Sequence, residues 1–279
     1  MAENLFLGTG VVLLGLAVGS FLNVVIYRLP KMIERQWAQE LALSAPKPTV
    51  SPEPPAPFNL AVPGSHCPHC GHALSWAEKI PLLSFIALKG RCRHCHVGIS
   101  WRYPAIEVLT ALLFFWSFSR YGLTAEALAW AGFAATLLAL GVIDADSTLL
   151  PDALTQPLVW AGLLVASLGL GQVDLSTALW GAMGGYAALW SVFWLFKLVT
   201  GKEGMGQGDF KLLAAMGAWL GWPSLLSLVL IASLSGIAGG LWLRFRHRLA
   251  EDGYIPFGPF LALAGLWVMA FGPLPLLPV

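Results

Sequence analysis

Apolar segments long enough to cross a lipid bilayer recur along this chain, and short polar connections separate most of them. A helix needs roughly 20 apolar residues to cross the hydrocarbon core. We expect about eight such segments, at residues 5–27, 104–119, 125–146, 155–171, 177–198, 210–222, 224–243 and 256–273. Of the 279 residues 57% are hydrophobic and 11% are charged, too little polar surface to coat a soluble protein of this size. The sequence predicts an all-α polytopic membrane protein.

Two of these segments leave alternatives open. The sixth is short and is followed by Gly221, Trp222 and Pro223, so it could join the seventh as one bent helix or form a partly re-entrant piece. The first could be a cleaved signal peptide, but its basic residues follow the apolar stretch instead of preceding it. We therefore expect a retained transmembrane helix at residues 5–27.

The Lys and Arg residues predict the orientation. Nine of the 16 lie in residues 28–103, and eight spans with this loop in the cytoplasm leave only Arg120 outside. Such a bias is typical of a correct topology, because cytoplasmic loops are rich in Lys and Arg. We expect an outside N-terminus. The net charge of +1 and the lack of a long basic block argue against nucleic acid as a partner.

The distribution of apolar and polar residues predicts three parts. Residues 1–27 form a first transmembrane helix, residues 28–103 a cytoplasmic loop, and residues 104–279 a helical membrane domain. Within the loop, residues 36–63 hold seven prolines and few large apolar residues, which indicates an extended spacer. The composition changes at residue 66, and we expect a small subdomain at residues 66–97.

This subdomain contains all four cysteines of the chain. They form two Cys-x-x-Cys pairs with 21 residues between them: Cys67, Cys70, Cys92 and Cys95. The pattern resembles a zinc ribbon, although the spacing is slightly longer than usual, and four sulfur ligands leave no open position for catalysis, so we predict a structural zinc ion. Two disulfides, unrelated buried thiols, redox chemistry or ligation by a neighbouring histidine are the alternatives, and the reducing cytoplasm argues against disulfides.

Two acidic residues stand at the ends of apolar segments. An unpaired charge inside a membrane costs at least about 2.5–3.5 kcal/mol, so such residues need a role. Asp144 ends the third segment and Asp209 opens the sixth, and the expected topology places both at the cytoplasmic boundary. Three glycines at residues 204–208 precede Asp209 and leave room for another chain.

A pair of carboxylates is suited to peptide hydrolysis. One ionised carboxylate takes a proton from water while a protonated partner polarises the carbonyl group. The sequence contains no His-Glu-x-x-His and no Gly-x-Ser-x-Gly motif. Asp146 and Asp152 are better explained as residues at helix ends, and Glu107 could pair with Arg102 or help to shape the site.

In combination, these features resemble the type IV prepilin peptidases, membrane aspartic proteases with a Gly-x-Gly-Asp site. The resemblance covers nearly the whole chain and rests on residues 19–30 (GSFLNVVIYRLP), the paired Cys-x-x-Cys segment, residues 80–84 (IPLLS), residues 102–104 (RYP), residues 144–152 and residues 206–209 (GQGD). Two departures are Lys79, where the family commonly has Asn, and a long proline-rich insert before Cys67.

The resemblance implies a bifunctional enzyme of the bacterial inner (plasma) membrane. It would cleave the leader of type IV prepilins or type II secretion pseudopilins at the cytoplasmic face, and then N-methylate the new terminus with S-adenosylmethionine. Its partners would belong to the pilus or type II secretion machinery. The family's pattern selects Asp144, eight residues before Asp152, and Asp209 as catalytic residues. The four cysteines match the zinc-associated cluster of the methylating members.

Two other functional classes remain open from the residues themselves. Intramembrane acids, glycine-interrupted helices and a regulatory zinc loop also fit an ion-coupled transporter, although transport sites lie near the membrane midplane. A non-catalytic scaffold of a secretion machine is the third hypothesis. Such a scaffold would tolerate Asp144→Asn.

Overall fold

The computed structural model describes residues 2–44, 57–202, 204–245 and 255–275. In this part of the chain the regular structure is helical, and two isolated β-bridges lie in the loop that contains the cysteines. The chain divides into two compact units, Met1–Gly122 and Leu123–Val279. The division falls at Gly122 and not at the expected residue 103, because helix α3 (Arg102–Tyr121) packs on helix α1 in the first unit.

Helix α1 (Ala2–Ser44) is longer than the apolar segment that predicted it. It continues for 17 residues beyond Tyr27, so the prediction of an extended spacer is wrong for residues 36–44. The reason is composition: residues 31–44 are rich in Glu, Gln, Ala and Leu, which favour helix, and the prolines of this region begin only at Pro46. Residues 45–56, which contain most of these prolines, lie outside the described residues.

Small residues bring α1 and α3 together. Gly15 and Gly19 are one helical turn apart on α1, and a Cβ atom on either would lie 2.6 or 2.7 Å from the Cα atom of Ala111 or Glu107 on α3. This spacing of two glycines is a common means of close helix packing in membranes. The loop between the two helices contains a 3-10 turn, η1 (Ala77–Lys79), and one short helix, α2 (Leu83–Ala87).

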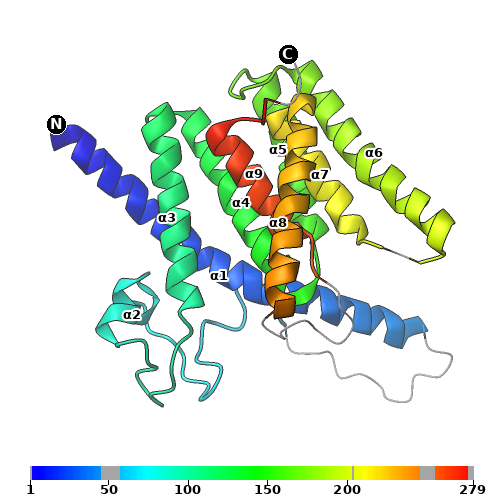
Figure 1. The fold of residues 1–279 in the computed structure, drawn as a ribbon. Helices are drawn as coiled ribbons and strands as arrows, with labels where there is room; N and C mark the ends of the chain where they lie inside the picture. The colour runs from blue at the N-terminus through cyan, green and yellow to red at the C-terminus, as the bar shows by residue number, and fades with distance from the viewer. Residues whose placement is uncertain (1, 45–56, 203, 246–254, 276–279) are drawn as a thin grey trace. The chain divides into compact units, whose positions relative to one another are not determined.

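In its described residues the second unit consists of six helices and one 3-10 turn. Its helices pack side by side as a bundle (Figure 1). They are α4 (Ala125–Ser147), α5 (Asp152–Ser167), α6 (Leu175–Thr200), α7 (Gln207–Leu220), η2 (Trp222–Ser224), α8 (Leu225–Phe245) and α9 (Gly258–Phe271). The predicted sixth and seventh segments are separate helices, because Gly221 takes a φ of 78° after α7 and η2 follows. The alternative of one bent helix is therefore wrong.

Helix α7 forms the core of this unit. From Asp209 to Leu220 its residues are buried except for Lys211, and it packs against α5, α6 and α9. Gly217 of α7 lies against Gly181 of α6 so closely that a Cβ atom on either would overlap the carbonyl group of the other. Side chains larger than hydrogen would force these two helices apart.

The helices fit a membrane protein. Four spans are long and apolar enough to cross a bilayer: Phe6–Ser44, Ala125–Ser147, Leu175–Thr200 and Trp222–Phe245. Each of the other four predicted segments also coincides with a helix, namely α3, α5, α7 or α9. The prediction of an all-α polytopic fold is confirmed.

Candidate active site and metal centre

The two acids singled out by the sequence are both buried in the second unit. Asp144 lies in the last turn of α4 and is 5% exposed, and Asp209 lies in the first turn of α7 and is 4% exposed. The two carboxyl groups are close enough to interact electrostatically. Residues 65 positions apart in the chain are thus brought to one site, where burial strengthens the effect of each charge on the other.

The glycine before Asp209 explains how the two helix ends approach. A Cβ atom on Gly208 would lie 2.6 Å from the Cβ atom of Leu150, in the connection between α4 and α5. The absence of a side chain at Gly208 therefore lets the start of α7 pack on the segment that follows Asp144. Gly206 precedes α7 in an extended conformation, and a Cβ atom added to it would meet no other atom within 4 Å.

A third helix contributes to this site, and sequence reasoning missed it. The main-chain N–H of Gly258, the first residue of α9, donates a hydrogen bond of 2.8 Å to Oδ2 of Asp144. A main-chain donor leaves no chemical signature in the sequence. One feature of the sequence could have pointed to this contact. Residues 256–259 (Pro-Phe-Gly-Pro) open an apolar segment and contain a glycine between two prolines.

The neighbouring acids have different surroundings. Asp152 is the first residue of α5, and its carboxylate oxygens lie 2.6 and 2.8 Å from Nζ of Lys211. The Asp152 side chain is 61% exposed, and Asp146 is also exposed. The structure therefore brings Asp144 and Asp209 together as a buried pair and leaves Asp146 and Asp152 at the surface.

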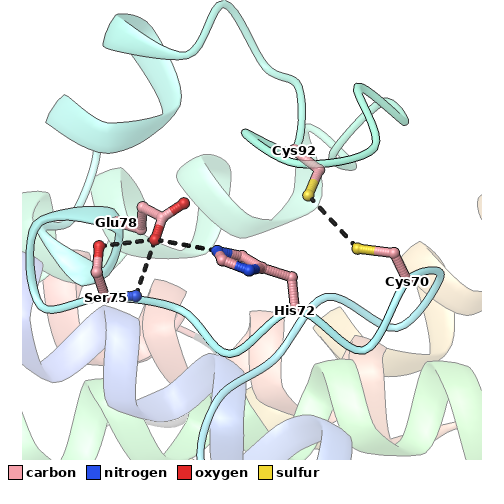
Figure 2. Close-up of polar contacts among 5 residues, drawn as sticks. All are labelled: Cys70, His72, Ser75, Glu78 and Cys92. Carbon is pink, nitrogen blue, oxygen red and sulfur yellow. Dashed lines mark hydrogen bonds and ion pairs between the residues drawn. The ribbon is translucent and has the colours of Figure 1, made fainter.

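The four cysteines of the first unit form a cluster that can hold a metal ion. Their Sγ atoms all lie within 4.8 Å of one another. The Sγ atoms of Cys67 and Cys95 are 3.9 Å apart. Those of Cys70 and Cys92 are 4.0 Å apart and face each other from two separate turns (Figure 2). All four are free thiols, so the disulfide alternative is wrong.

Each Cys-x-x-Cys pair stands on the same kind of turn. The N–H of Cys67 donates to the carbonyl of His72, and the N–H of Cys92 donates to that of Val97, both at 2.9 Å. Main-chain hydrogen bonds from Cys70 and His69 lower the pKa of Cys67 to about 7. Hydrogen bonds from the equivalent positions, Cys95 and His94, lower the pKa of Cys92. The first cysteine of each turn therefore favours the thiolate, which is the metal-binding form of cysteine. A main-chain hydrogen bond from His72 acts to lower the pKa of Cys70, but burial and the neighbouring cysteines raise it to about 12.

The histidines near the cluster have other partners. His72 stacks on the ring of His94 with centroids 5.3 Å apart, and its Nε2 lies 3.7 Å from a carboxylate oxygen of Glu78. Glu78 also accepts hydrogen bonds from the N–H and the hydroxyl of Ser75, at 2.8 and 2.6 Å (Figure 2). These bonds lower the pKa of Glu78. Among the described residues the metal-binding group consists of the four cysteines.

Buried polar side chains attach the loop to α1 and α3. Arg28 of α1 is 7% exposed and donates to the carbonyl oxygens of Asn59 at 2.9 Å and Pro63 at 2.6 Å. Glu107 of α3 accepts a hydrogen bond of 2.8 Å from the N–H of Leu82, which has a positive φ of 58°. The sequence left the role of Glu107 open, and the structure shows that it holds this turn.

The chain is similar to known proteins along nearly all of its length. The model of the Bacterial Peptidase A24 N-terminal domain matches residues 13–121, and that of the Type IV leader peptidase family matches residues 131–241. No solved structure matches significantly.

Curated relatives cover most of the chain. The prepilin leader peptidase/N-methyltransferase of Burkholderia pseudomallei is 50% identical over 94% of this chain and 84% of its own length. The proteins of the same name from Pseudomonas aeruginosa and Aeromonas hydrophila are 52% and 51% identical, over 94% of this chain and 89% and 90% of theirs. With two buried aspartates in the second unit and a four-cysteine cluster in the first, the chain belongs to the type IV leader peptidase family.

Proposed function

We propose that this chain removes the leader peptide of type IV prepilins and then N-methylates the new N-terminal residue, with Asp144 and Asp209 as the catalytic residues. The observation that carries the proposal is the burial of these two carboxyl groups at adjoining helix ends of one unit. Membership of a peptidase family and the name of the curated relatives support it. They give no support to the alternative of an ion-coupled transporter.

The chemistry needs one ionised and one protonated carboxyl group. The ionised carboxylate accepts a proton from water, and the resulting hydroxide equivalent attacks the carbonyl carbon of the scissile peptide bond. The protonated partner donates a hydrogen bond and then its proton to the carbonyl oxygen. When the tetrahedral diol intermediate collapses, the proton taken from water passes to the leaving nitrogen, a hydroxyl proton of the diol returns to the second carboxylate, and the C–N bond breaks.

We propose zinc as the metal of the four-cysteine cluster. Zn–S bonds of 2.3 Å in a tetrahedron separate the sulfur atoms by about 3.8 Å. The distances of 3.9 and 4.0 Å between facing cysteines fit this geometry. Cys67, Cys70, Cys92 and Cys95 would fill all four positions, so the ion would stabilise the loop, and binding of water for catalysis is left to other groups.

The remaining parts of the proposal concern the substrates and the membrane. The curated relatives are named as N-methyltransferases, which supports S-adenosylmethionine as the methyl donor. They are also named as prepilin leader peptidases, which supports prepilins as substrates. Pseudopilins and the pilus or type II secretion machinery are proposed as further partners. The Lys and Arg of residues 28–103 support an inner-membrane protein with this loop and the active site on the cytoplasmic side.

The test is cleavage of a purified prepilin by the protein reconstituted in lipid vesicles. We expect Asp144→Asn and Asp209→Asn each to lower the cleavage rate by about 10²–10⁴-fold or more, because each removes one partner of a general acid–base pair. Asp146→Asn is the matched control, since that residue is exposed and two positions from Asp144.

Helical circular dichroism and thermal unfolding must show that each variant is folded. Normal processing by either active-site variant would reject the catalytic assignment. It would favour the scaffold hypothesis, which tolerates Asp144→Asn.

A further inference from the structure

The two aspartates of the pair have unequal surroundings, and the difference comes from helix α9. The N–H of Gly258 donates to Asp144 at 2.8 Å. Among the described residues, the Asp209 carboxylate has no corresponding hydrogen-bond donor, and its electrostatic neighbour is Asp144. A hydrogen bond from an N–H group favours the ionised form of a carboxylate.

The start of α9 presents this one donor. Pro259 has no N–H group, and the N–H groups of Phe260 and Leu261 both donate to the carbonyl of Phe257 at 3.1 Å. Gly258 is therefore the residue whose main-chain donor is available to another helix. At the N-terminal end of a helix the first N–H groups have no acceptor within the helix, and the carboxylate of Asp144 accepts the one from Gly258.

Glycine allows the start of α9 to approach the carboxyl group closely, and a Cβ atom at this position would have to displace the Asp144 side chain. A Cβ atom on Gly258 would lie 2.6 Å from Oδ2 and 2.9 Å from Cγ of Asp144. One turn before Asp144, a Cβ atom on Gly141 would lie 3.0 Å from the Cβ atom of Ala262 in α9. Small residues on both helices thus hold the N–H of Gly258 against the carboxylate.

The other charged groups nearby do not reverse this asymmetry. Helix α9 contains no titratable residue, and the single one on α5, Asp152, is paired with Lys211 of α7 at 2.6 Å. Asp209 lies in the first turn of α7, where the helix dipole also favours an anion. A direct hydrogen bond to a charged group is roughly two to three times stronger than that dipole effect.

We infer that the N–H of Gly258 keeps Asp144 as the charged, proton-accepting member of the pair, and that Asp209 carries the shared proton and donates it. The inference rests on the proposed function, because it assigns the base and the acid of the same reaction. Gly258 is a positioning residue, since it acts through Asp144.

Infrared spectroscopy of the protein in lipid tests the assignment without any measurement of cleavage. A protonated carboxyl group in a buried site gives a C=O stretching band that shifts in D2O. We expect the wild type at neutral pH to lose one such band in Asp209→Asn, because the remaining Asp144 is ionised. Any band from Glu107 is constant in both proteins and cancels in the difference spectrum. An unchanged band in Asp209→Asn would overturn the assignment, because Asp144 would then hold the proton.

Two variants at residue 258, each combined with Asp209→Asn, test the role of the N–H group. Gly258→Ala and Gly258→Pro both add a Cβ atom before Pro259, but only Pro removes the donor. We expect a new protonated-carboxyl band from Asp144 in the Pro variant and none in the Ala variant. The same spectrum from both would show that the N–H does not set the charge of Asp144.

Cleavage by the two variants with Asp209 intact provides a second comparison. We expect both variants to lower kcat, because both crowd Asp144. As the pH falls, the Pro variant should lose activity at a higher pH than wild type, whereas the Ala variant should not. Identical pH profiles would contradict the inference. A wild-type protein that does not cleave would reject the proposed function, and the infrared assignment would still be measurable.

Discussion

The four-cysteine cluster and the aspartate pair are built in opposite ways. The cysteines lie on two short turns within 29 residues, and each turn forms its own hydrogen bonds. The aspartates lie at the ends of two helices, α4 and α7, and a third helix supplies the donor to Asp144. A local site that holds a metal ion would depend on that ion, whereas a site assembled from distant helices depends on the packing between those helices.

The largest expected effect follows from removal of the metal ligands. Cys92→Ser, or a strong chelator, should reduce bound metal from one ion per chain to almost none, because structural zinc sites are held by about 10–16 kcal/mol of binding energy. Methyl transfer to a pre-cleaved pilin should fall with it. Prepilin cleavage should largely remain, because the aspartates belong to the other compact unit.

Metal content by mass spectrometry and the two activities on one preparation check this prediction. Asp144→Asn is the reciprocal control, and it should keep the metal while losing cleavage. A parallel loss of cleavage and metal in Cys92→Ser would show that the two sites depend on each other.

The second effect concerns helix packing around Asp209. Gly217→Ala places a methyl group against the main chain of Gly181, and overpacking of this kind costs about 1–3 kcal/mol. We expect lower unfolding stability and slower cleavage with unchanged metal content. Gly132→Ala is the matched control in α4, because a Cβ atom there meets nothing within 4 Å. Equal stability of the two variants would disprove the packing argument.

A smaller effect is expected next to the metal cluster. The hydrogen bonds from Ser75 lower the pKa of Glu78, so the Glu78 carboxylate stabilises the loop above its ordinary pKa of 4.5 and loses this effect as the pH falls through the lower, folded value. Glu78→Gln should speed amide exchange at Ser75 at neutral pH. The difference from wild type should shrink in acid, whereas Glu40→Gln on the exposed end of α1 should change nothing. A difference that does not depend on pH would exclude the charge of Glu78 as its cause.

The smallest effect is expected for the ion pair near the aspartate pair. Lys211 and Asp152 form an exposed pair, and such pairs contribute about 0–1 kcal/mol. Asp152→Asn, Lys211→Met and the double variant should differ little in unfolding stability, and all three should cleave prepilin. A coupling energy well above this range, or a loss of cleavage, would place the pair among the determinants of the active site.

The sequence predicted the parts whose information is local. The spacing of the cysteines, the eight apolar segments and the two acids at segment ends could all be read from neighbouring residues. The contact between Gly258 and Asp144 could not, because it joins residues 114 positions apart through a main-chain atom that every residue except proline possesses. The length of α1 was missed for another reason, since the helix continues through Pro30 into a polar segment rich in helix-favouring residues.

The burial of α7 has a consequence for how a peptide could reach Asp209. Neighbouring helices enclose this short helix, and Gly217 and Gly181 meet without room for a side chain between them. If Asp209 keeps this position during cleavage, a bound peptide has to adapt its own backbone to the acid. Selection among substrates would then depend on how readily the segment around the cut bond leaves its helical conformation.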